Sequence, residues 1–369
     1  MFVAGYTDIN NRIPSAAAGF PNTFVPVRDL LYLSEGPGPD GRVTFREVGE
    51  ALGLDLVAES GDYEYGLGGA VADFDGDGDL DLYVANDTNP NRLYENIAWP
   101  GGMADDPLGI GFRLQHAPES GVDDDNSGMG VAAGDYTGDG RSDLFVTNLG
   151  SQLHSVYINE TETTLSFEEG TSALGAPDLG GDYTGWGATW ADVDLDTDLD
   201  LVIANGAVPL LDRVADAQPM QVLSNQVAAG PAPDLRDIST ELGLDNIGPL
   251  LARGSAVADY DNDGDLDVAV NSIGSPVRLL RNDVRGRWLT VELEGFHPGA
   301  VVTAVLPDGT ELVRTILAGS SYLSSEDPRA HFGLGRAESV AELRVRWPDG
   351  SETVRAGLES NQTIVVEQS

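Results

Sequence analysis

Four copies of one nine-residue acidic motif divide this chain more clearly than any other feature of its sequence. They begin at Asp73, Asp135, Asp192 and Asp259, and the first copy is D-F-D-G-D-G-D-L-D. A largely apolar run that includes a β-branched residue follows each copy, as in residues 82–86, and such a run favours a β-strand. The starts of the copies are 62, 57 and 67 residues apart. This regular recurrence predicts a repeat protein whose units are organised around acidic loops.

The crowding of aspartates in each copy predicts a bound divalent cation. Several carboxylates held so close together repel one another unless a cation lies among them. Calcium takes roughly six to eight oxygen ligands, and alternate residues of a tight loop can direct their side chains toward one centre. We expect side-chain ligands at loop positions 1, 3, 5 and 9 and a backbone carbonyl ligand at position 7. Glycines at positions 4 and 6, Gly76 and Gly78 in the first copy, allow the positive-φ bends that wrap an ion.

The four loops span residues 73–81, 135–143, 192–200 and 259–267, and together they are expected to hold up to four calcium ions. Their candidate metal-site residues are Asp73, Asp75, Asp77, Asp79, Asp81, Asp135, Thr137, Asp139, Arg141, Asp143, Asp192, Asp194, Asp196, Asp198, Asp200, Asp259, Asp261, Asp263, Asp265 and Asp267. The second loop should bind more weakly, because Thr137 and Arg141 replace aspartates at positions 3 and 7. The third has Leu195 and Thr197 where glycine or asparagine is favoured, which leaves its metal binding open. A single such motif is also compatible with a solvated acidic turn, but four in one repeat frame favour metal sites.

An EF-hand starts with a similar acidic pattern and is the main alternative. It requires a bidentate Glu at position 12 and a helix after the loop. Position 12 is instead β-branched in all four copies: Val84, Val146, Ile203 and Val270. Each loop is therefore predicted to join two β-strands, which also argues against dockerin-like pairs. Thrombospondin-type calcium repeats normally carry cysteines, and this chain has none.

Each repeat contains four short strand-like segments, which predicts the blades of a β-propeller. In the first complete unit these segments are residues 68–72, 82–86, 92–96 and about 112–114. Because the repeat period is long for a propeller, the connecting loops must be long. Trp186 and Trp190 in the third unit form either a sugar-stacking platform or part of the packing between blades, and we favour the packing.

The two ends of the chain differ from the repeats. Residues 2–7 align with residues 83–88, which leave a loop, yet no loop precedes them. We therefore expect that an upstream portion of the propeller is missing, and a signal peptide with it. After residue 283 the acidic loops stop, and alternating strands with Pro-Asp-Gly turns follow. The expected domains are a calcium-binding propeller over residues 1–283 and a small β domain over residues 284–369.

Charge and composition limit the partners and the compartment. The net charge is −41 and the pI is about 4.1, which disfavours nucleic acid and anionic membranes as partners. All 20 basic residues are arginine, a bias that suits adaptation to high salt, a GC-rich coding sequence, or both. No run of 18 apolar residues occurs, so we expect no membrane insertion. Weak calcium loops fill in an extracellular medium, which predicts a location outside the cell, at its surface or in the periplasm.

Several segments carry a resemblance to known families. The segment G-W-G-A-T-W-A-D (185–192) and the acidic loops are similar to FG-GAP/VCBS repeats, the calcium-binding blades of integrin-α-like propellers. The tail is similar to the ASPIC/UnbV domain, through R-W-L (287–289), A-G-S-S-Y-L-S (318–324), D-P-R (327–329), H-F-G-L-G (331–335), V-R-W-P-D-G (345–350) and Q-T (362–363). Together they resemble the cartilage acidic protein family and its bacterial homologues over nearly the whole chain.

This resemblance implies an all-β fold, with an integrin-α-like propeller followed by a small β-sandwich-like domain. It also implies a secreted protein that binds calcium through its loops and acts in adhesion or other contacts with an extracellular protein or glycan. Two departures stand out. Such propellers typically have seven blades whereas four complete loop units are present, and the segment 295–299 is shorter than usual.

An enzymatic function is the competing hypothesis. The four histidines are His116, His154, His297 and His331, and neither G-x-S-x-G nor H-E-x-x-H occurs. We expect His331 to be a packed or turn-stabilising residue. The sequence therefore favours a binding protein over an enzyme, with an extracellular hydrolase or lyase acting on polysaccharide as the alternative.

Overall fold

The computed structural model describes residues 1–14, 19–54, 63–102, 104–171, 179–225, 235–317 and 319–368. Within these residues β-strands dominate, which confirms the all-β prediction. The helical elements described are single turns: α1 (Gly49–Leu52), η1 (Pro118–Ser120) and η3 (Leu244–Asn246). None of the helices in the described residues is long and apolar enough to cross a membrane.

Three successive sheets are four-stranded antiparallel meanders, in which each strand pairs with the next one along the chain. Their strands are β6 (Gly66–Ala72), β7 (Asp81–Asn86), β8 (Arg92–Ala98) and β9 (Phe112–His116); β10 (Val131–Gly134), β11 (Asp143–Val146), β12 (Ser155–Asn159) and β13 (Phe167–Glu169); and β14 (Gly185–Ala191), β15 (Asp200–Asn205), β16 (Gln221–Asn225) and β17 (Leu235–Asp237). A fourth sheet has three strands, β18 (Ala252–Ala258), β19 (Asp267–Ser272) and β20 (Arg278–Leu280). In all four sheets an acidic loop joins the first strand to the second, so the predicted strand–loop–strand unit is confirmed.

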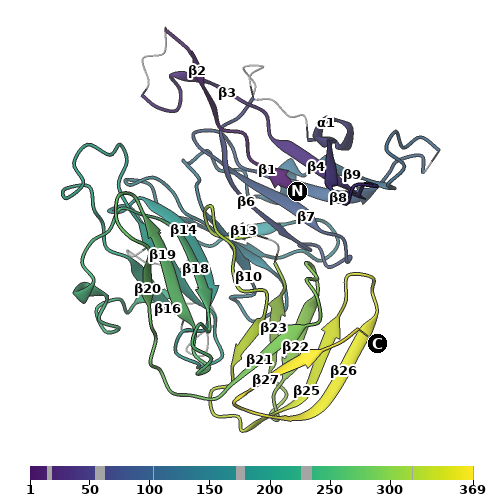
Figure 1. Cartoon of the computed structure of the whole chain (residues 1–369), viewed down its shortest axis with the longest axis vertical. Coiled ribbons are helices and arrows are strands. Elements are labelled where there is room, and N and C mark those ends of the chain that lie inside the picture. Colours follow the sequence, from purple (N-terminus) through teal and green to yellow (C-terminus); the bar gives the residue numbers. More distant parts are fainter. Residues whose placement is uncertain are drawn as a thin grey trace.

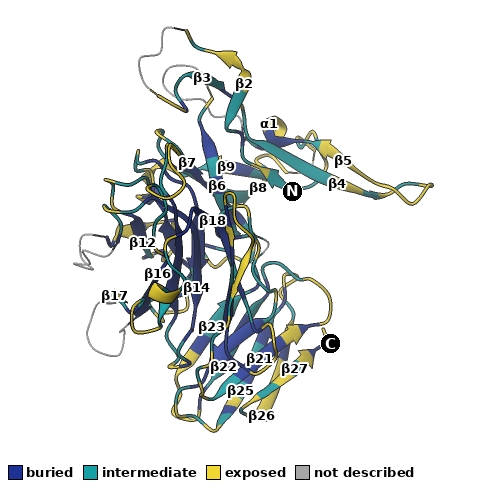
Figure 2. Cartoon of the chain, turned by 60° about the vertical axis from the view of Figure 1, so that its left-hand side comes forward, coloured by how far each residue is buried: buried dark blue, intermediate teal, exposed yellow. Residues whose placement is uncertain are grey.

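The four sheets stack as neighbouring blades of a propeller (Figure 1). Apolar side chains from adjacent blades interlock: Tyr83 and Leu144 share one buried cluster, and Phe145 and Leu201 share the next. The third blade has a neighbouring blade on each side, because β14 contacts both β10 and β18. Every residue of β14 and β15 is buried, and Figure 2 shows β14 in the colour of buried residues. Strands buried on both faces favour continuous apolar runs over alternating ones, which explains the sequence D-L-V-I-A-N in β15.

The N-terminal unit is a three-stranded sheet of β1 (Phe2–Val3), β4 (Leu30–Pro37) and β5 (Val43–Glu47). Phe2 and Leu31 pack against the buried cluster of the first complete blade. A separate two-stranded ribbon, β2 (Thr7–Arg12) with β3 (Phe24–Pro26), projects from this unit, and the sequence analysis did not predict it.

The tail forms two sheets around a single apolar core. One sheet has the order β24-β21-β27, with parallel pairing of β21 and β27, and the other has the order β23-β22-β25-β26. The strands are β21 (Trp288–Leu293), β22 (Val301–Val305), β23 (Glu311–Thr315), β24 (Ala330–Gly333), β25 (Ser339–Arg346), β26 (Glu352–Glu359) and β27 (Gln362–Val366). Trp347 is fully buried between the sheets. The sandwich-like tail is confirmed, although β24 was not predicted, because its four residues are too few to show an alternating pattern.

A segment of the tail, residues 319–328, lies against the first strands of the blades. Ser321 forms an isolated β-bridge with Val131 of β10. The Glu326 carboxylate accepts hydrogen bonds from the Thr189 hydroxyl of β14 (2.7 Å) and the Val257 amide of β18 (2.7 Å). This segment therefore ties the tail to three successive blades.

Candidate metal centres

The four acidic loops follow one backbone path, although their sequences differ. Positions 4 and 6 have positive φ in every loop. The residues and angles are Gly76 (77°) and Gly78 (99°), Gly138 (76°) and Gly140 (90°), Leu195 (62°) and Thr197 (101°), and Asn262 (60°) and Gly264 (99°). The third loop therefore adopts the same positive-φ path as the loops that carry glycine or asparagine, which its sequence left open, at the cost of backbone strain at Leu195 and Thr197.

Carboxylates converge in three of the four loops. In each group the oxygens lie within 4.8 Å of one another, a spacing that suits a shared cation. The groups are Asp73, Asp75 and Asp81 in the first loop; Asp192, Asp194 and Asp200 in the third; and Asp259, Asp261 and Asp263 in the fourth. The other predicted ligands lie outside these groups. Asp77 and Asp79, for example, are exposed at the tip of the first loop.

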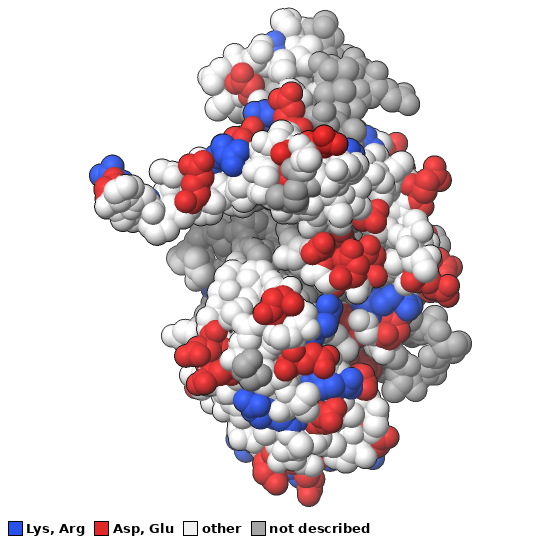
Figure 3. Space-filling model, turned by 90° about the vertical axis from the view of Figure 1, so that its right-hand side faces the viewer, with Lys and Arg blue, Asp and Glu red and all other residues white. Residues whose placement is uncertain are grey.

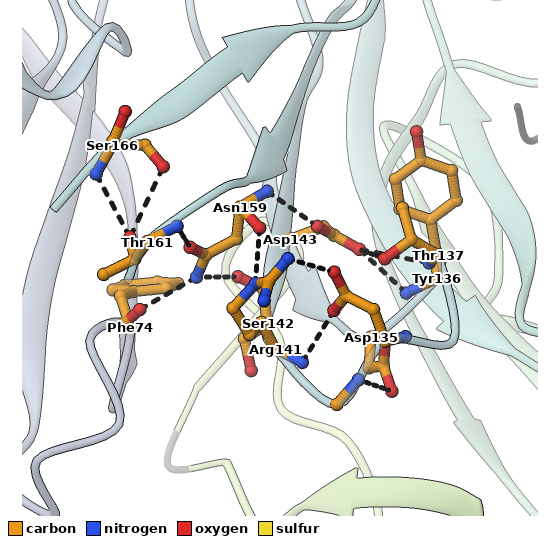
Figure 4. A network of polar contacts seen from close by, with 12 residues as sticks. Phe74, Asp135, Tyr136, Thr137, Arg141, Ser142, Asp143, Asn159, Thr161 and Ser166 are labelled. Carbon is orange, nitrogen blue, oxygen red and sulfur yellow. Dashed lines mark hydrogen bonds and ion pairs between the residues drawn. The ribbon is translucent and has the colours of Figure 1, made fainter. Parts of the chain in front are cut away.

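The second loop forms no such group in the part of the chain that the structure describes (Figure 4). Arg141 pairs with Asp139, and its Nε donates to the carbonyl of Asn159 (2.7 Å). The hydroxyl of Thr137 donates to the Asp143 carboxylate (3.1 Å). A guanidinium and a hydroxyl thus use the oxygens that a cation would need, in line with the expected weakness of this loop.

The aspartate at position 9 anchors every loop. One oxygen of Asp143 accepts the amide N–H of Tyr136 at position 2 (3.1 Å), and the other accepts that of Asn159 at the end of the third strand (2.8 Å). Asp81, Asp200 and Asp267 make the same pair of bonds in their own loops. Position 9 thus closes the loop onto its own blade.

An asparagine at or near the end of each third strand completes this network, and the sequence analysis assigned it no role. In three blades its Nδ2 donates to the position-2 carbonyl of the preceding blade's loop. These contacts are Asn159 to Phe74 (2.8 Å), Asn225 to Tyr136 (2.9 Å) and Asn282 to Val193 (2.8 Å). The recurrence of Asn at this position of the repeat was the available signal. The asparagines link neighbouring acidic loops directly.

Burial and mutual repulsion raise the pKa of several loop carboxyl groups. Desolvation is the main cause: it raises the pKa of Asp81 and of Asp200 to about 8, although backbone N–H groups donate to both. Desolvation and the charge of Asp196 raise the pKa of Asp194 to about 6. A divalent cation would favour the ionised forms and remove this electrostatic cost.

Buried oxygens without hydrogen-bond partners lie in the same three loops. They are Oδ1 of Asp73, Oδ1 of Asp194 and both oxygens of Asp265. A buried carboxylate oxygen with no donor is costly, so each of these atoms fits a site that is completed by a ligand. All are hard oxygen donors, the class that calcium prefers. The residues present therefore fit calcium in the first, third and fourth loops.

The tail domain presents cationic and polar side chains to the loops. Nη2 of Arg346 lies 3.1 Å from Oδ2 of Asp73 in the first loop. Nη2 of Arg329 donates to the carbonyl of Asp259 (3.1 Å), and Nε2 of His331 lies 2.9 Å from the carbonyl of Gly264, both in the fourth loop. His331 is buried and contacts a turn, as predicted. No local sequence pattern predicts these contacts, because they join segments far apart in the chain.

The tryptophans of β14 are packing residues. Trp190 stacks on Tyr136 of the preceding blade, with ring centroids 4.8 Å apart. Nε1 of Trp186 donates to the carbonyl of Gly206, and the Arg253 guanidinium lies over its ring. Both side chains are buried, so blade packing, the favoured alternative, is confirmed.

Acidic side chains extend beyond the loops. Figure 3 shows them spread over the whole face in view, with arginines set among them. On this face the acidic side chains are thus not gathered into a single patch.

Comparison with known families agrees with this architecture. The FG-GAP-like repeat family matches residues 73–146 and 135–203, which contain the first three acidic loops. The ASPIC and UnbV family matches residues 294–369, within the tail domain. The chain therefore contains FG-GAP-like repeats followed by an ASPIC/UnbV domain. Its four successive sheets agree with the blades of an integrin-α-like propeller.

Its similarity to particular proteins extends over most of the chain. Cartilage acidic protein 1 of Homo sapiens is 27% identical over 331 residues, which cover 85% of this chain and 46% of that protein. Cartilage acidic protein 1 of Xenopus tropicalis is 27% identical over 364 residues, which cover 95% of this chain and 51% of that protein. The chain thus spans about half the length of these relatives. The crystal structure of the V. cholerae biofilm matrix protein Bap1 aligns with 89% of this chain and 55% of its own, with 13% identity and a TM-score of 0.27, too low to define a shared fold.

Proposed function

We propose that this chain is an extracellular calcium-binding propeller protein that makes contacts with a protein or glycan partner and performs no catalysis. The main support for this proposal is that three loops follow the same backbone path and that carboxylates converge in each of them. The buried, unpartnered oxygens of Asp73, Asp194 and Asp265 lie in these same loops. The similarity to cartilage acidic protein 1 supports a role in extracellular contacts.

Calcium would act here as a structural ion that neutralises the loops. Position 1 is held by loop amides: Asp192 accepts the N–H groups of Asp196 and Thr197 at 3.0 and 3.1 Å. Position 9 is held by the anchoring bonds described above, so the candidate ligand side chains are oriented before any ion arrives. Such preorganisation reduces the entropic cost of ordering ligands on binding. The loops also join the strands that pack between blades, so neutralisation of the loops would stabilise the packing of one blade against the next.

Calcium titration of the chain tests the proposal. A ligand bound only by the folded state adds RT ln(1 + [L]/Kd), or about 2.7 kcal/mol per site at a hundredfold excess over Kd. We expect the thermal unfolding midpoint to rise with calcium and to fall with a chelator. The position-3 variant Asp75→Asn should reduce this response, because Asp75 belongs to the first carboxylate group. The control Asp308→Asn, in an exposed turn of the tail, should not. An unfolding midpoint that is the same with calcium and with chelator would refute the calcium function.

The fourth loop offers a separate optical test. Trp288 of the tail lies directly on it, since a β-carbon at Gly264 would be 1.8 Å from the indole Nε1. Terbium bound in this loop should therefore show luminescence sensitised by Trp288, and calcium should displace it. The variant Asp261→Asn should weaken the signal. A wild-type chain that gives no sensitised emission would argue against metal in this loop.

The contact function requires its own assay. Panels of extracellular glycans and proteins should include a partner that binds with calcium and is released by the chelator. If the chain degraded a polysaccharide, and mutation of a residue beside the first strands of the blades abolished that activity, the non-catalytic assignment would be contradicted.

A further inference from the structure

The tail domain places an arginine directly on a candidate metal ligand of the propeller. Arg346, the last residue of β25, has Nη2 3.1 Å from Oδ2 of Asp73, and its partner is 273 residues away in the chain. The Asp73 side chain is 4% exposed and that of Arg346 is 38% exposed, so solvent screens the pair only in part. The guanidinium also borders the loop turn, because a β-carbon at Gly78 would lie 3.5 Å from Nη1.

The two oxygens of Asp73 face different partners. Oδ2 accepts hydrogen bonds from the Gly78 amide (3.1 Å) and from Arg346 (3.1 Å). Oδ1 is buried, has no hydrogen-bond partner, and belongs to the residue group with Asp75 and Asp81. A cation that enters the loop through Oδ1 would therefore share one carboxylate with the arginine of the tail.

This arrangement differs from that of the third and fourth loops. Both oxygens of Asp192 and both oxygens of Asp259 accept amide N–H groups of their own loops. Arg329 reaches the fourth loop through backbone and amide oxygens, and its charge is balanced by Asp327, 2.5 Å away. In the fourth loop, Arg281 of the propeller lies 4.0 Å from Oδ2 of Asp261. In the third loop, the charge of the buried tail residue Arg314 favours the ionised form of Asp192 without forming an ion pair. Within the described residues, Arg346 is the tail arginine that lies within ion-pair distance of a carboxylate of these groups.

We propose that Arg346 tunes the calcium affinity of the first loop and couples that site to the docking of the tail domain, an inference that rests on the proposed calcium function. With metal–oxygen distances of roughly 2.4 Å, an ion on Oδ1 would lie about 6 Å from the guanidinium. Repulsion between a divalent and a monovalent charge at that distance, at a dielectric near that of water, corresponds to about a tenfold change in affinity, and salt reduces it. By linkage, calcium weakens the docking contact of Arg346 by the same factor.

The experiment is calcium titration calorimetry on the full chain. A parent that carries Asp194→Asn and Asp261→Asn reduces binding at the third and fourth loops, so the titration reports mainly on the first. Arg346→Gln should lower Kd by about threefold to tenfold. Arg344→Gln is the matched control: Arg344 lies on the same strand, is 37% exposed, and pairs with Glu311 and Glu342 in the tail. It should leave Kd unchanged.

Arg346→Lys keeps the positive charge and should keep the Kd of the parent, which separates charge from packing. The Arg346→Lys variant also keeps the inference testable if Arg346→Gln fails to fold. If Arg346→Lys lowered Kd as much as is expected for Arg346→Gln, the inference would be overturned. Equal Kd values for Arg346→Gln and Arg344→Gln overturn the coupling and leave the calcium function intact. A wild-type chain that takes up no calcium overturns both.

Discussion

Replacement of Asn159 by alanine tests whether neighbouring blades are joined through their acidic loops. Asn159 is fully buried, and its side chain makes three hydrogen bonds (Figure 4). Nδ2 donates to the carbonyl of Phe74 in the preceding blade (2.8 Å) and to that of Ser142 in its own loop (3.0 Å). Oδ1 accepts the amide of Thr161 (2.9 Å). Alanine removes all three bonds and leaves three buried backbone groups without these partners.

The size of the effect follows from this count. A buried group left unsatisfied costs about 1 to 3 kcal/mol, and partial relaxation favours the lower end. We therefore expect Asn159→Ala to lower the free energy of unfolding by about 3 to 4 kcal/mol. Urea unfolding followed by tryptophan fluorescence measures this change, because Trp190 stacks on the loop residue Tyr136.

Asn96→Ala is the matched control, because Asn96 holds the equivalent position of the third strand in the preceding blade, where its N–H donates to the position-9 aspartate Asp81. Its Nδ2 makes one longer bond, to the carbonyl of Leu80 in its own loop (3.3 Å). The expected loss is about 1 kcal/mol or less. Equal losses in the two variants would refute the argument that Asn159 joins one blade to the next.

Two further predictions concern the loops themselves. With a chelator present, stability should fall as pH rises from about 5 to above 8. Burial raises the pKa of Asp81 and of Asp200 in the folded state to about 8, above the ordinary value in the unfolded chain. Between these two pKa values the folded state keeps protons that the unfolded state has released, which stabilises the fold. This stabilisation is lost as the pH rises through the folded pKa. Melting curves across this pH range check the slope, and a chelated protein that gains stability toward pH 8 would contradict the assignment. Thr197→Gly should stabilise the third loop by about 1 kcal/mol, because glycine tolerates φ near 101° and threonine does not. Urea unfolding measures this change in the free energy of unfolding. Gly78→Ala makes the opposite change at the same position of the first loop and should destabilise the protein. A destabilised Thr197→Gly variant would show that the strain is absent.

Much of the propeller was predictable because its signals are local. Nine-residue spacing brings Asp73, Asp75 and Asp81 into one loop, whatever surrounds it. Position 12 is a β-branched residue, such as Val84, where an EF-hand requires glutamate, and the apolar run around it favours a strand. Repetition of the unit then defines blades, since a single unit cannot bury its own apolar faces. Among the described residues the second loop has no converging carboxylate group, and this was foreseeable from Arg141, which pairs with a neighbour two residues away.

The rest depends on contacts between distant segments. The positive φ angles of Leu195 and Thr197 oppose their intrinsic preference, and the anchoring bonds of Asp192 and Asp200 stabilise that strained path. The short strand β24 forms through its pairing with β21 and not through its own pattern.

From its sequence alone, this chain specifies the acidic loops, the strands on either side of them and the repetition that makes blades, because each of these depends on residues a few positions apart. The tertiary structure decides which loop oxygens are free, which asparagine reaches the neighbouring blade, and where Arg346 meets Asp73. Those outcomes depend on hydrogen bonds and charges brought together across as many as 273 positions, and no local pattern encodes the distance between two such groups.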